Sequence, residues 1–76
     1  MTPKQQFDYD EGVKQGFQPY WIMYCLYNNL EINSVPETMG DFIIWIIAKT
    51  RQFEIDKKTE YIGNSKQFLE WLKEEL

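Results

Sequence analysis

The sequence has no histidine, one cysteine, one alanine and one arginine among its 76 residues. Without histidine, the chain lacks the commonest general base and metal ligand, and no unperturbed side chain titrates near neutral pH. Cys25 cannot form an internal disulfide, so no oxidising compartment is required and we expect a cytoplasmic protein. Eight isoleucines and seven lysines beside so little alanine and arginine favour A+T-rich coding, as in low-GC bacteria and their phages.

Long apolar runs are also missing. The longest run, 20–27, has eight residues, whereas a transmembrane helix needs about 20, so we expect no membrane partner. The four glycines are isolated and form no phosphate-binding loop. The net charge of −4 has the wrong sign for gripping a phosphate backbone, so we expect no nucleic-acid binding.

A short acidic cluster invites a metal-binding interpretation. Asp8, Asp10 and Glu11 have the spacing of carboxylates that share a hard cation. A calcium loop beginning at Asp8 needs glycine at its sixth position and glutamate at its twelfth, but Val13 and Pro19 stand there. The sequence therefore favours a solvated helix face, and we expect neither a metal nor a cofactor.

Cys25 is the one candidate nucleophile. It lacks a histidine base, and its apolar neighbours should raise the pKa of the thiol by desolvation. We therefore interpret Cys25 as a small buried side chain and expect a protein that is not an enzyme.

The stretch SVPETMGDFIIWIIAKTRQF, residues 34–53, predicts a helix. Ser34 and Glu37 form a capping box at its start, and an apolar stripe at helical spacing continues to Phe53. Its apolar arc is wide enough to need several covering partners, so we expect this helix, about 35–53, in the middle of the domain. The rival interpretation is a buried strand over 42–48, because an isoleucine-rich apolar run suits a strand equally well.

The other segments also favour helices. Thr2 and Gln5 form a second capping box for a helix over 3–15, which Gly16 should end. Residues 19–30 predict a second helix, and a helix capped by Ser65 should run to the C-terminus. Residues 53–62 suit either a short β-hairpin or a continued helix followed by a polar loop. The sequence thus predicts one domain, 1–76, of the mainly α class: a bundle of three to four helices around the central helix.

The aromatic content is high, with five phenylalanines, five tyrosines and three tryptophans. On the helix over 19–30, Tyr20, Tyr24 and Tyr27 form a stripe of phenols nearly opposite an aliphatic stripe, and Trp21 lies between them. The phenols either cover the central helix, with their hydroxyls reaching water, or form a surface left for a partner. Because tryptophan and tyrosine are enriched in binding hot spots, these four residues are the candidate protein-binding site.

The leading hypothesis is a small non-enzymatic protein that covers a surface of another protein, as an inhibitor, adaptor or small subunit. One alternative is a structural homodimer that pairs through the aromatic helix face. A second alternative is an acidic mimic of nucleic acid, although the carboxylates are spread over the whole chain.

Overall fold

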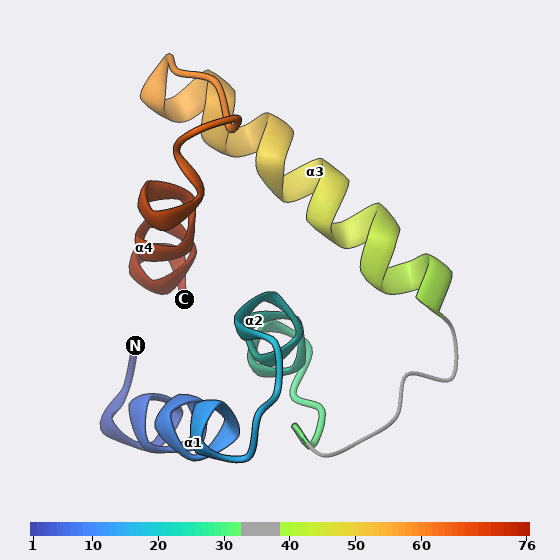
Figure 1. Ribbon diagram of the computed structural model, residues 1–76, viewed down its shortest axis with the longest axis vertical. Coiled ribbons are helices and arrows are strands. Elements are labelled where there is room, and N and C mark those ends of the chain that lie inside the picture. The colour runs from blue at the N-terminus through green and yellow to red at the C-terminus, as the bar shows by residue number, and fades with distance from the viewer. Residues whose placement is uncertain (33–38) are drawn as a thin grey trace.

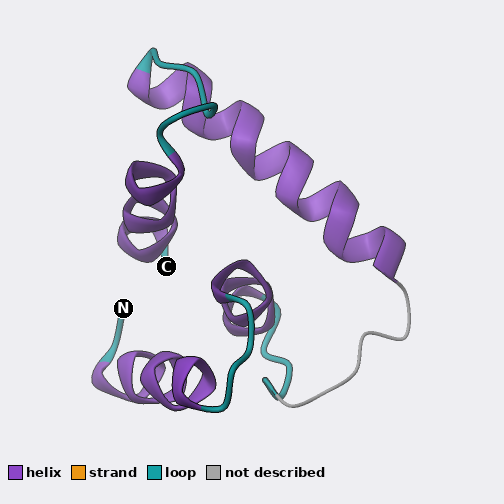
Figure 2. Ribbon diagram, in the orientation of Figure 1, coloured by secondary structure: helices purple, strands orange, loops and turns teal. Residues whose placement is uncertain are grey.

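The computed structural model describes residues 1–32 and 39–76, which form four α-helices. They are α1 (Pro3–Lys14), α2 (Pro19–Tyr27), α3 (Met39–Lys57) and α4 (Ser65–Glu75). Figure 2 shows helices and loops, with no strand in the described part of the chain. The predicted mainly α bundle is therefore confirmed, and the rival strand over 42–48 is wrong. The capping box at Ser34 and Glu37 lies outside the described residues.

Local signals at α1 act as the sequence predicts. The Thr2 amide donates to Oε1 of Gln5 over 2.8 Å, and the Gln5 amide donates to Oγ1 of Thr2 over 3.2 Å. Two amides without helical partners are thereby satisfied at the start of the helix. Gly16 follows the helix with a φ of +88°, the left-handed conformation that glycine adopts without strain.

Helix α2 begins at Pro19 as expected but ends at Tyr27, three residues before the predicted end. The side-chain amide of Asn28 donates to the carbonyl of Tyr24 over 2.8 Å, and Asn29 takes a left-handed φ of 55°. The Leu30 amide then donates to the carbonyl of Cys25 over 2.9 Å, which closes the end of the helix. Leu30 is consequently exposed and does not extend the aliphatic stripe.

The β-hairpin interpretation of 53–62 is wrong, and the alternative of a continued helix with a loop is confirmed. Helix α3 runs through Phe53, which is fully buried, and ends at Lys57. Lys58 has a φ of 51°, which turns the chain out of the helix. The Glu54 carboxylate accepts from the Tyr61 amide over 2.9 Å and so holds the loop against the end of α3.

The central position belongs to α2, which corrects the expectation that the helix over 35–53 would occupy it. Helix α2 contacts α1, α3 and α4, whereas α3 contacts α2 and α4 alone (Figure 1). Nearly every residue of α2 is apolar or aromatic, so the helix needs neighbours on all sides. Helix α3 carries exposed polar side chains and runs along one edge of the molecule.

The buried core joins side chains from all four helices. Its members are Tyr9 of α1, Ile22 and Met23 of α2, Phe53 of α3, and Phe68, Trp71 and Leu72 of α4. We expected Ser65 to cap α4, but Asn64 occupies the cap position and Ser65 is the first residue of the helix.

No helix in the described residues is both long and apolar enough to cross a membrane.

Candidate protein-binding surface

Tyr27 lies on the side of α2 that faces α3 and α4. Its hydroxyl donates to the carbonyl of Leu72 over 2.8 Å. Its ring meets Trp45 with the centroids 5.4 Å apart, and the ammonium of Lys49 lies 4.7 Å from the same ring. Burial, together with the negative charge of Glu75, raises the pKa of Tyr27 to about 12. This phenol is therefore neutral at physiological pH and joins three helices.

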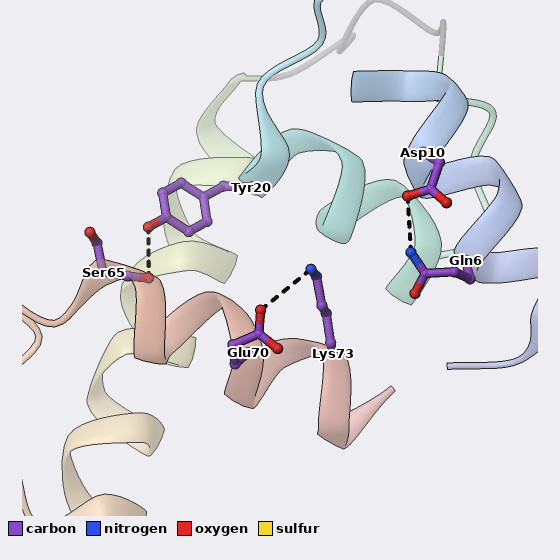
Figure 3. A network of polar contacts seen from close by, with 6 residues as sticks. All are labelled: Gln6, Asp10, Tyr20, Ser65, Glu70 and Lys73. Carbon is purple, nitrogen blue, oxygen red and sulfur yellow. Dashed lines mark hydrogen bonds and ion pairs between the residues drawn. The ribbon is translucent and has the colours of Figure 1, made fainter. Parts of the chain in front are cut away.

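Tyr20 packs against the start of α4. Its hydroxyl donates to the carbonyl of Ser65 over 3.4 Å (Figure 3) and accepts from the hydroxyl of Tyr61, also over 3.4 Å. The Tyr20 and Phe68 rings are 5.7 Å apart. Burial is the main cause that raises the pKa of Tyr20 to about 12.

Tyr24 and Trp21 complete the aromatic contact between α2 and α3. The two rings stack with centroids 5.3 Å apart, and Phe42 of α3 meets each of them edge-on at 5.5 Å. Trp45 meets Tyr24 at 5.5 Å. Trp21 is only 9% exposed, and its Nε1 donates to the carbonyl of Ile32 over 3.2 Å.

The four predicted site residues are thus close together, and the contacts described above join them to other residues of the same chain. Edge-to-face ring pairs of this kind add to the stability of a core beyond the area that they bury. Covering the helix over 34–53 was one of the two interpretations of the phenol stripe, and the contacts of Tyr24 and Tyr27 with Trp45 agree with it. The hydroxyls of Tyr20 and Tyr27 donate to carbonyls of α4, where that interpretation had them reach water. The assignment of the four residues as contacts to another protein stays a prediction.

Cys25 is fully buried, and burial raises the pKa of its thiol to about 11. The thiol is therefore protonated at neutral pH and is a poor nucleophile. Cys25 lines a hollow of about 670 Å³ that lies between α1 and the segment after α2. Other lining residues include Asp8, Glu11 and Gly12.

Asp10 and Glu11, two of the three acidic residues of α1, pair with neighbours on their own helix. Asp10 accepts from the amide of Gln6 over 3.0 Å (Figure 3), and Glu11 lies 3.6 Å from the ammonium of Lys14. In the part of the chain that the structure describes, no group of three or more histidine, cysteine or carboxylate side chains is placed to hold a metal ion. On α4, Lys73 pairs with Glu70 at 3.6 Å in the same view.

The largest group of exposed apolar side chains on one helix lies on the outer side of α3. In the first half of α3, Ile44 is 68% exposed, Met39 60%, Ile43 50% and Ile47 46%, and Ile55 near the end of the helix is 79% exposed. Gly40 is exposed among them. We call this surface, formed by Met39, Gly40, Ile43, Ile44 and Ile47, the α3 face. The opposite side of the same helix is held by Phe42, Trp45 and Phe53 against α2 and α4.

Sequence reasoning proposed an uncovered surface on the helix over 19–30 and did not single out the exposed apolar side chains of α3. The signal that could have located them was the width of the apolar arc on 34–53, which exceeds what two neighbouring helices can cover. Ile43 and Ile47 belong to the exposed part of that arc.

Comparison with protein-family models, with curated proteins and with solved structures gives no match to this chain.

Proposed function

We propose that this chain is a small non-enzymatic protein that binds another polypeptide and covers an apolar surface on it with the α3 face. The observation that carries this proposal is the group of four adjacent aliphatic side chains on α3, each between 46% and 68% exposed. Contiguous exposed apolar side chains on a small soluble domain are typical of interaction sites. An inhibitor, an adaptor and a small subunit all act in this way.

The α3 face is supported from behind. The rings of Phe42 and Trp45 pack edge-on against Tyr24, each with a centroid distance of 5.5 Å. These contacts hold the inner side of α3 against α2. A helix held in this way loses little further freedom on binding, which lowers the cost of association. The aromatic residues of α2 thus contribute by positioning α3.

The energy available from the α3 face is modest. Full burial of an isoleucine side chain contributes ~1.5–3 kcal/mol, so four side chains that are about half exposed offer roughly 3–6 kcal/mol. Association itself costs ~4–15 kcal/mol. A partner must therefore also contact residues that flank the face, and an apolar groove or a helix with a similar face meets this need.

Site-specific photo-crosslinking tests the proposal. A photoreactive amino acid replaces Ile44 in one variant and Ile62, an exposed residue in the loop before α4, in the other. We expect a polypeptide of defined mass to be crosslinked from position 44 and not from position 62. Equal yields from the two positions, or none from position 44, would show that the α3 face is not a binding site.

A further inference from the structure

Three residues of the α3 face, together with Arg51, have the spacing of a coiled-coil seam. Gly40, Ile44, Ile47 and Arg51 follow one another at intervals of four, three and four residues, which is the spacing of a and d positions in heptads. All four residues are exposed. Figure 1 shows that one side of α3 is turned away from α1, α2 and α4.

The same intervals occur in both directions along the helix, so the seam matches an antiparallel copy of itself. A twofold axis between Trp45 and Ile46 places Ile44 opposite Ile47 of the second copy. The same axis places Gly40 opposite Arg51 of the second copy. Each of these contacts occurs twice, as it must in a contact between identical surfaces.

The sizes of the two residues favour the contact between Gly40 and Arg51 of the second copy. A Cβ atom added at Gly40 meets no atom of residues 1–32 and 39–76 within 4 Å, so the described part of the chain gives no packing reason for glycine there. Glycine is a poor helix former. Opposite the long side chain of Arg51, however, its missing side chain leaves the space that the arginine needs.

Charge selects the antiparallel direction. Asp41 follows Gly40, so in the antiparallel arrangement Arg51 of one copy would approach Asp41 of the other copy, and the two ends of the seam would be equivalent. A parallel pair would instead bring Arg51 next to Arg51 and leave Gly40 facing Gly40. Asp41 and Arg51 are both exposed, so salt should weaken this contribution.

We propose that the α3 face is an interface between two copies of this chain, packed as an antiparallel helix pair. In this pair Ile44 contacts Ile47 of the second copy, and Arg51 spans Gly40 toward Asp41. This inference rests on the proposed function, because it names the polypeptide that the α3 face covers.

Sedimentation equilibrium of the full chain over a range of concentrations tests the dimer. We expect wild type to dimerise reversibly and Ile44→Glu to raise the dissociation constant by at least about tenfold. Ile62→Glu is the matched control, since it adds the same charge at an exposed isoleucine outside the α3 face, and it should dimerise like wild type. A wild type that stays monomeric, or a dimer that Ile44→Glu leaves unchanged while circular dichroism shows both variants folded, would overturn the inference.

Gly40→Ala separates packing between copies from packing within the chain. Alanine should raise the melting temperature of the monomer, because it is the better helix former, and should weaken the dimer, because its methyl group occupies the space of Arg51. A variant that dimerises as tightly as wild type would contradict the contact between Gly40 and Arg51.

Disulfide trapping tests the direction of the pair. Chains with Ile44→Cys are mixed with chains carrying Ile47→Cys and oxidised, while Cys25 stays protected by burial. The mixed disulfide should form faster than the disulfide between two Ile44→Cys chains. The reverse order would exclude the antiparallel register.

The photo-crosslinking experiment keeps the two proposals distinguishable. A crosslink from position 44 to a second copy supports both proposals. A crosslink to a different polypeptide, with a monomeric purified chain, retains the binding function and overturns the dimer. No crosslink from position 44 removes both.

Discussion

The hydroxyl of Tyr27 in α2 donates a hydrogen bond of 2.8 Å to the carbonyl oxygen of Leu72 in α4. Leu72 is one of the last four residues of α4, and the carbonyl groups at a helix end lack helical donors. The hydroxyl of Tyr27 therefore supplies a hydrogen-bond donor to a carbonyl near the end of α4. This bond joins residues that are 45 positions apart in the sequence.

Removing that hydroxyl should weaken the bundle. We expect Tyr27→Phe to lower the free energy of unfolding by ~0.5–1.5 kcal/mol, the usual contribution of one hydrogen bond, because the ring contact with Trp45 is kept. Urea denaturation followed by circular dichroism measures the change. Tyr24→Phe is the control, since Tyr24 contacts Phe42 and Trp45 through its ring. An equal loss in both variants would contradict the role of the bond.

The two phenols with raised pKa values should make the fold sensitive to alkali. Both Tyr20 and Tyr27 have a pKa of about 12 in the folded chain, against 10.0 for an unperturbed tyrosine. Between these values the unfolded chain loses protons that the folded chain keeps, so the free energy of unfolding falls as pH rises. The stabilising contribution is complete below pH 10 and is lost as pH approaches 12.

Denaturation midpoints measured on both sides of pH 10 test this dependence. The fall in stability above pH 10 should be shallower in Tyr27→Phe than in wild type, because one of the two titrating phenols is gone. A wild type whose stability stays constant up to pH 12 would show that these hydroxyls ionise as easily in the folded chain as in the unfolded chain.

Two helical glycines should respond to alanine in opposite directions. A Cβ atom at Gly12 would lie 2.8 Å from Cδ1 of Ile22 and 3.1 Å from Cγ2 of Ile32, whereas at Gly40 it meets no atom of the residues that the structure describes within 4 Å. Ile22 is fully buried and has little room to move. Overpacking of this kind costs ~1–3 kcal/mol, while the better helix propensity of alanine returns ~1 kcal/mol.

We therefore expect Gly12→Ala to lower the melting temperature and Gly40→Ala to raise it. Thermal unfolding at a concentration where the chain is monomeric measures both. If Gly12→Ala also stabilises the chain, α1 does not pack closely on α2 at this glycine.

Signals confined to a few neighbouring residues were sufficient to predict where a helix begins and ends. The capping box at Thr2 and the left-handed Gly16 gave the ends of α1 from sequence alone, because both depend on local hydrogen bonds and backbone freedom. Local alternation at 53–62 was misleading because Phe53 is held in α3 by Phe68 and Trp71, which come later in the chain. Tertiary contacts decided that segment.

The candidate surface depended on tertiary contacts to a greater extent. The phenol stripe and the apolar arc of 34–53 were both visible as patterns, and periodicity identifies which residues share a face. It does not identify which face meets a neighbour. Helix α2 takes the central place, so its Tyr24 is covered by Phe42, and Ile44 on the far side of α3 is left exposed.

The contact between α3 and α4 gives a last prediction. Nε1 of Trp71, which is 5% exposed, donates to the carboxylate of Asp56 over 2.8 Å. Asp56→Ala leaves this buried donor without its partner, which should cost ~1–3 kcal/mol of unfolding free energy. Asp56→Asn keeps an acceptor oxygen in the same place and should recover most of the loss. Urea denaturation with tryptophan fluorescence measures the two variants, and an asparagine variant as unstable as the alanine variant would show that charge, and not the hydrogen bond, is what Asp56 supplies.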